Sequence, residues 1–194
     1  MKIAHTAIAA ALGLAFCGAA FAQAGTVQRD VNQQQRIEQG LQSGQLTTKE
    51  ASKLEREESR VERDQSRAMQ DGKLSPAEKS RLAREQNQVS RDIYREKHDA
   101  QTGNPNSASS QRMQADVQRN INQQQRIEQG VKSGSLTNKE TARLERGESK
   151  IDRKEARAGA NGNVNAREQQ RIQKAENRES RRIYKEKHDK QSKK

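Results

Sequence analysis

Two copies of the sequence Glu-Lys-His-Asp hold the side chains with the clearest potential for chemistry. Their histidines are His98 and His188, and Tyr94 and Tyr184 precede them by four residues, so each pair shares one helix face. A metal site needs three or four convergent ligands, and each copy offers one imidazole beside carboxylates. His98 and His188 are therefore candidate metal ligands only for a site shared between repeats or between chains. The competing interpretation places them as solvated cations at helix C-termini.

Residues 71–78 look like the second half of an EF-hand calcium loop. In that alignment Gly72 takes the sixth position and Glu78 the twelfth. The first and third positions are then Arg67 and Met69, where calcium requires oxygen ligands. The segment is better explained as a turn glycine followed by a helix-capping box.

Catalytic machinery is missing from the sequence. The only cysteine lies in the first 22 residues, serine and aspartate are scattered among polar residues, and no glycine-rich phosphate loop is found. Hydrophobic residues make up 29% of the chain, which leaves little material for the rigid core of an enzyme. We therefore expect a non-enzymatic protein without a cofactor.

The N-terminus has the layout of a secretory signal peptide. Lys2 precedes an apolar run at residues 8–16, and a small-x-small cleavage site ends at Ala22. A lipoprotein anchor at Cys17 is disfavoured because the preceding residue, Phe16, is large. We expect cleavage after Ala22 and a periplasmic or secreted protein.

The remaining chain is an internal duplication. Residues 27–99 align without gaps to residues 117–189 at an offset of 90, with 38 identities in 73 positions. Residues 100–116 are rich in Gly, Asn, Pro and Ser, as in a flexible linker, and residues 190–194 form a basic tail. The predicted organisation is a signal peptide (1–22), two repeats, the linker and the tail.

Helical signals fill each repeat, and no strand pattern is found. Thr47 with Glu50 and Ser75 with Glu78 form capping boxes, and Pro76 takes the first helical position. The fold prediction is all-α: a tandem duplication of a three-helix unit, built as open antiparallel hairpins or a bundle with a shallow core, with a partly disordered linker and tail. The predicted helices span residues 27–43, 48–70 and 76–98, and again 117–133, 138–160 and 166–188.

Thin apolar stripes run along these helices. Leu, Ile and Val total 21 of the 172 residues after Ala22, so disorder competes with any fold. The stripes are also the candidate surface for contact with clients or partners. The candidate contact residues are Leu54, Val61, Leu82, Val89, Tyr94, Leu144, Ile151, Ile172 and Tyr184.

The charge is positive and uneven. The net charge is +12, with +1 in residues 27–99 and +7 in residues 117–189. Such a surface attracts anions. Expected partners are unfolded or acidic envelope proteins, or anionic envelope surfaces, whereas export argues against nucleic acid as the natural partner.

Short motifs resemble those of a known family. Leu46-Thr47-Thr48-Lys49-Glu50 and its copy at residues 136–140 are similar to the Leu-Thr-x-x-Gln motifs of the Spy/CpxP family, with Glu in place of Gln. The resemblance implies a basic, all-helical periplasmic protein that acts as an ATP-independent chaperone or stress-signalling inhibitor, with a homodimer among the expected assemblies. The chain equally resembles uncharacterised secreted repeat proteins of Gram-negative bacteria.

The expected function is therefore chaperone-like or stress-related binding of unfolded or anionic envelope components. Two alternatives stay open. One is a structural or adhesive module that binds envelope polyanions, and the other is a metal- or calcium-responsive protein.

Overall fold

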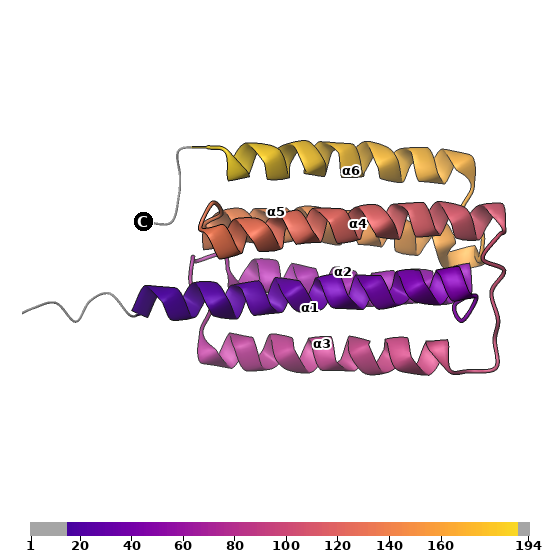
Figure 1. Ribbon diagram of the computed structural model, residues 1–194, viewed down its shortest axis with the longest axis horizontal. Helices are drawn as coiled ribbons and strands as arrows, with labels where there is room; N and C mark the ends of the chain where they lie inside the picture. The colour runs from indigo at the N-terminus through magenta and orange to yellow at the C-terminus, as the bar shows by residue number, and fades with distance from the viewer. Residues whose placement is uncertain (1–14, 190–194) are drawn as a thin grey trace, which may run out of the picture.

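The computed structural model describes residues 15–189, with side chains described from residue 23, and all of its regular elements are helices (Figure 1). The predicted all-α fold is confirmed, with no strand in the described range. The start of the expected signal peptide and the tail 190–194 lie outside the described residues. The elements are α1 (Ala15–Ser43), α2 (Thr48–Ala68), α3 (Pro76–Lys97), α4 (Ala108–Ser133), α5 (Asn138–Ala158), a 3-10 turn η1 (Gly159–Asn161) and α6 (Ala166–Lys187). None of the helices described is both long and apolar enough to cross a membrane.

Capping boxes set the starts of four helices. Thr47, Ser75, Thr137 and Asn165 each accept a hydrogen bond from the backbone N–H three residues on, and the glutamate at that position bonds back. Each such cap contributes about 1 kcal/mol to stability. Because residues 71–78 form a turn and a capping box, this interpretation of the segment is confirmed.

Glycines in the left-handed region form the predicted turns between helices. Gly72 has φ 90° before α3, and Gly162 has φ 85° before α6. An L side chain is strained in this conformation, so the chain reverses at these residues at low cost only with glycine.

The linker is shorter than expected. α4 begins at Ala108, so the prediction of a linker over residues 100–116 is wrong for 108–116. Ser107 caps α4 by accepting a hydrogen bond from the Ser110 backbone N–H, and Met113 is completely buried. The cap at Ser107 and the burial of Met113 therefore stabilise a helix in a segment whose composition is typical of a loop.

The two repeats interlock and do not form separate open hairpins. The most extensive helix contacts join α2 to α5 and α1 to α4, while α3 and α6 flank this central group on opposite sides (Figure 1). Paired helices run antiparallel: the Asn138 side chain at the start of α5 donates a 2.7 Å hydrogen bond to the Gly72 carbonyl beyond the end of α2. Each repeat thus completes its core with the other.

Two serines mark the centre of the interlocked structure. The Ser59 hydroxyl donates to the Ser149 carbonyl at 2.9 Å, and the Ser149 hydroxyl donates to the Ser59 carbonyl at 2.8 Å. These residues are equivalent under the 90-residue offset. Their reciprocal bonds place a pseudo-twofold relation between α2 and α5 at this point.

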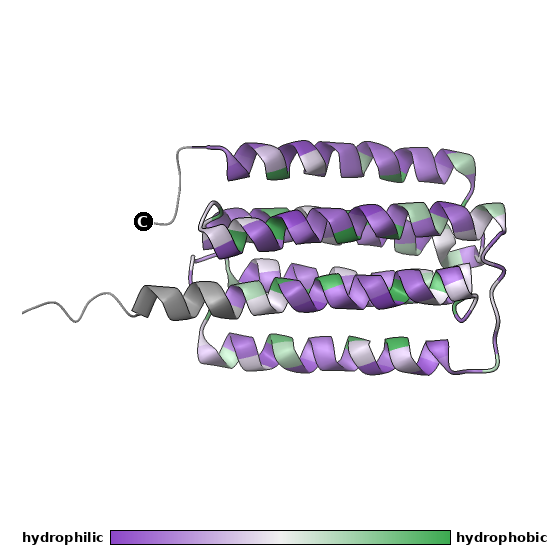
Figure 2. Cartoon of the chain, in the orientation of Figure 1, coloured by the Kyte–Doolittle hydropathy of each residue, from purple (hydrophilic) through white to green (hydrophobic). Residues whose placement is uncertain are grey.

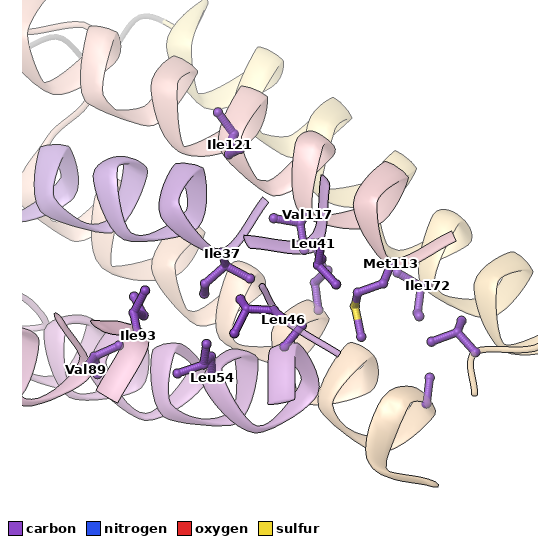
Figure 3. Close-up of a cluster of buried hydrophobic side chains, with 14 of the residues drawn as sticks. Ile37, Leu41, Leu46, Leu54, Val89, Ile93, Met113, Val117, Ile121 and Ile172 are labelled. Carbon is purple, nitrogen blue, oxygen red and sulfur yellow. The ribbon is translucent and has the colours of Figure 1, made fainter. Parts of the chain in front are cut away.

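Apolar packing occurs in patches. Figure 2 shows hydrophobic bands separated by hydrophilic ones along every helix. The largest apolar cluster joins Ile37 of α1, Leu46 and Leu54, which lie close together in Figure 3, to Met113 and Val117 of α4. A second cluster joins Val27 of α1 to Ile127 of α4 and Leu144 of α5. The predicted stripes are thus core residues, and they bridge the repeats.

Truncation of Leu54 in α2 or of its equivalent Leu144 in α5 tests whether the two repeats share one core. Leu54→Ala and Leu144→Ala each empty a fully buried site, so each is expected to lower the free energy of unfolding by about 2–5 kcal/mol. Because the core is shared, far-UV circular dichroism should show one melting transition that shifts as a whole. Two separate transitions, of which only one shifts, would contradict a shared core.

Candidate functional site: a buried carboxylate core

Acidic side chains line the inner face of the central helices. α2 contributes Glu55, Glu58 and Glu62, whose spacing of three and four places them on one face. No lysine or arginine is among the buried residues of the described chain. Carboxylates buried without cations are costly unless they are protonated or bind a cation. Two of the other buried acids near this face have a cationic partner, because Glu176 pairs with Arg119 at 3.1 Å and Glu179 pairs with Arg182 at 3.2 Å. The remaining ones are Asp30, Asp116, Glu145, Glu148, Asp152 and Glu155.

Three of these carboxylates converge into a compact group. Glu55 of α2 and Asp152 and Glu155 of α5 each place a carboxylate oxygen within 4.8 Å of the others. All three side chains are fully buried. We call them the core triad.

Amide side chains orient the core triad. The Gln34 amide donates to one oxygen of Glu55 at 3.0 Å, and the Asn120 amide donates to one oxygen of Glu155 at 2.8 Å. Asn120 also lies 3.4 Å from Asp152 Oδ1. The second oxygen of each acid, Glu55 Oε1, Asp152 Oδ2 and Glu155 Oε1, is buried and receives no hydrogen bond from an amide, a hydroxyl or a cationic group. Glu55 also hydrogen-bonds the carboxyl group of Glu155, and Asp152 that of Glu62, as protonated acids can do with one another. Amides thus hold the triad from outside, and the acids face one another on the inside.

The other repeat carries a modified copy of this arrangement. Gln65 stands where the second repeat has Glu155, and Asp30 stands where it has Asn120. The hydrogen bond is kept, because the Gln65 amide donates to Asp30 at 2.7 Å. The acid and the amide have exchanged helices, so each repeat retains one carboxylate–amide pair.

Glu62 and Glu145 complete this second copy. The Gln124 amide donates to Glu62 at 2.7 Å and to Glu145 at 3.3 Å. With Gln65 in the third position, the copy has one carboxylate fewer than the core triad. Asp30, in the place of Asn120, restores the number of acids, but of the two equivalent places only the core triad brings three carboxylate oxygens within 4.8 Å of one another.

A further pair of acids lies beside the pseudo-twofold centre. Both carboxylate oxygens of Glu58 and of Glu148 are buried without partners. Near Glu148, Glu179 fills the space above Gly147, where an added Cβ would lie 2.1 Å from the Glu179 carboxyl carbon. Glu179 replaces the Val89 of the first repeat, so the loss of a side chain at position 147 makes room for another buried acid.

Burial raises the pKa values of these acids. Desolvation raises the pKa of Asp30, Asp116 and Asp152 to about 7, and that of Glu176 to about 8. For Glu55, desolvation comes first and the charge of Asp152 second, and together they hold its pKa well above the usual range. Burial in this core therefore favours the protonated form of the acids near neutral pH.

The sequence-based metal candidates lie away from this core. His98 and His188 follow α3 and α6 as their exposed C-caps, as expected for solvated residues at helix C-termini. Their rings stack on Tyr94 and Tyr184 with centroids 4.1 Å apart. The clusters of metal-ligating side chains found among the described residues contain neither histidine. Nothing in the structure completes a ligand set around them.

Two other acidic clusters lie at the ends of the bundle. Glu50, Glu96 and Asp99 form one, and the equivalent residues of the second repeat form the other. In the first, Glu50 serves its capping box and Glu96 pairs with Lys53 at 2.6 Å. These clusters already have structural partners, in contrast to the core triad.

The expected contact residues divide into two groups. Tyr94 and Tyr184 are 61% exposed and accessible to a partner. The other seven are buried in the apolar clusters, so contact with a client through them requires the bundle to open. These seven are Leu54, Val61, Leu82, Val89, Leu144, Ile151 and Ile172.

The sequence analysis missed the acidic core because it followed the apolar residues of each helix and not the acids between them. The available signal was the spacing of Glu55, Glu58 and Glu62, which recurs in the second repeat at the same positions. Acids that are three and four residues apart lie on one side of a helix, and because these begin next to the buried Leu54, that side faces the core.

Comparison with protein-family models, with curated proteins and with solved structures finds no match for this chain. The candidate function therefore rests on the geometry of the site itself.

The raised pKa values predict an unusual pH dependence. Because the folded chain holds protons on acids such as Asp30 and Asp152 more tightly than the unfolded chain, stability is greatest at low pH and falls as pH rises through about 7. In a metal chelator, the protein should melt at a higher temperature at about pH 5 than at about pH 8. Each fully buried acid contributes on the order of a few kcal/mol. Equal or higher stability at the upper pH in chelator would show that the acids are not buried as described.

Proposed function

We propose that the protein binds a hard, multivalent cation inside its helical bundle, with Glu55, Asp152 and Glu155 as ligands. The observation that carries this proposal is the convergence of three buried carboxyl groups whose second oxygens receive no hydrogen bond from an amide, a hydroxyl or a cationic group. An acidic cluster on a surface is solvated by water, whereas this one is enclosed by protein.

The dimensions of the core triad suit a shared ion. Two oxygens that each lie about 2.4 Å from a calcium-sized cation can be at most about 4.8 Å apart. The ligand oxygens of the triad lie within 4.8 Å of one another. The three carboxyl groups are therefore close enough to one another to face a single shared ion.

The ligand chemistry selects the class of cation. The triad offers carboxylate oxygens alone, and Asn120 Oδ1 nearby is a further buried oxygen without a partner. Oxygen ligands favour Ca²⁺, Mn²⁺ or Mg²⁺ over Zn²⁺ or Cu²⁺, which prefer imidazole or thiolate. Gln34 and Asn120 act as the outer hydrogen-bond donors that fix the orientation of ligating carboxylates.

Cation binding also accounts for how such a core persists. An ion bound at the triad supplies the positive charge that the buried side chains lack, so it stabilises the folded state by an amount that rises with the logarithm of its concentration once this exceeds the dissociation constant. Client binding remains a prediction. The apolar residues expected to contact a client are buried in the core, so the bundle must open before they can bind one. Of the alternatives left open by the sequence, a cation site in the core supports the metal- or calcium-responsive protein.

Neutral substitutions separate a cation site from a purely structural core. In chelator, Asp152→Asn and Glu155→Gln are expected to keep or raise the melting temperature, because each removes a buried acid. With Ca²⁺ or Mn²⁺, the wild-type protein is expected to melt several degrees higher, and both variants are expected to lose most of this gain. Calorimetric titration of the same proteins gives the affinity.

Glu148→Gln serves as the matched control. It removes an equally buried acid that lies outside the triad, so it should keep most of the cation-dependent gain. If Ca²⁺, Mn²⁺ and Mg²⁺ leave the wild-type melting temperature unchanged, or if the control loses the gain as fully as the triad variants, the proposed site is refuted.

A further inference from the structure

The outer face of α2 and α5 contains a groove lined by arginines. Arg56, Arg60 and Arg63 come from α2, and Arg153 and Arg157 come from α5. The buried Ser59 at the pseudo-twofold centre and Ala156 complete the lining. Two helices whose inner faces carry acids thus carry a cationic groove on the outside.

Arg60 and Arg63 also border a neighbouring pocket lined by Glu57, Asp64, Glu85 and Asp92, whereas the groove itself is positively charged. No carboxylate lines it. Within the described residues, Arg56, Arg60, Arg153 and Arg157 form no ion pair, and Arg63 has only a 3.8 Å contact with Asp64. Five guanidinium groups that converge in this way repel one another, and an anion that enters the groove removes this repulsion.

The shape of the groove indicates an extended anion. Arg56 and Arg63 are seven residues apart on one helix, so they are separated by about 10 Å along the axis. Arg153 and Arg157 face them from the antiparallel helix. A single phosphate cannot reach such a row of cations, whereas a chain of phosphates can contact guanidinium groups on both sides.

The lining also argues against other polyanions. It contains no aromatic side chain on which a nucleic-acid base could stack. A membrane presents a flat array of headgroups, and a groove between two helices contacts a thread better than a plane. Guanidinium groups bind tetrahedral phosphate oxygens through paired hydrogen bonds.

We propose that the arginine groove between α2 and α5 binds a linear chain of phosphates, such as inorganic polyphosphate. Arg56, Arg60 and Arg63 contact one side of the chain, and Arg153 and Arg157 contact the other. This inference is independent of the cation site, because it rests on the opposite faces of the two helices.

Binding of fluorescently labelled polyphosphate, measured by fluorescence anisotropy in chelator, tests the groove. The full mature chain is compared with the triple variant Arg60→Gln/Arg153→Gln/Arg157→Gln. The control is Arg171→Gln/Arg178→Gln/Arg181→Gln on α6, which removes the same charge from exposed arginines outside the groove. Circular dichroism checks that both variants remain helical.

The groove variant is expected to bind polyphosphate about tenfold or more weakly than wild type, and the control within about twofold of wild type. Orthophosphate at equal phosphorus concentration should compete poorly. Equal loss in both variants would show that net charge alone drives binding and would overturn the proposal. It is overturned equally if wild type does not bind, or if single-stranded DNA or anionic vesicles bind as tightly and depend on the same arginines.

Discussion

Acids buried without cations are the constraint on which this structure depends. The four central helices place carboxylates such as Glu55, Glu62 and Asp152 in an interior where no lysine or arginine is buried in the described range. Such an interior exists only if protons or a bound cation supply positive charge. The amides of Gln34 and Asn120 limit the cost by donating hydrogen bonds, and the flanking helices α3 and α6 exclude water from the sides.

The duplication explains how the chain holds this interior together while the two halves differ. The reciprocal bonds between Ser59 and Ser149 join equivalent positions, so each repeat closes the core of the other. Where the repeats differ, a change at one position is matched by a change at a contacting position. The acid and the amide of one hydrogen-bonded pair have exchanged helices, and Gly147 makes room for Glu179. The result is one compact triad of acids rather than two equal ones.

Local structure could be predicted from the sequence, and the site could not. Capping residues such as Thr47 and turn glycines such as Gly72 act through neighbouring backbone, so helix starts and turns followed from the chain. The pairing of α2 with α5 depends on contacts 90 residues apart, and a hydrophobicity pattern treats Glu58 as a solvent-facing residue. Only the interlocked packing shows that the acidic side of these helices faces inward and the arginine side faces out.

The most direct test is a crystal structure of the mature protein grown with Mn²⁺, with anomalous scattering used to locate the metal. Cation binding in the core predicts an anomalous peak enclosed by the carboxylates of Glu55, Asp152 and Glu155. A map without a peak at this position, in which the same carboxyl groups contact one another directly through shared protons, would contradict it.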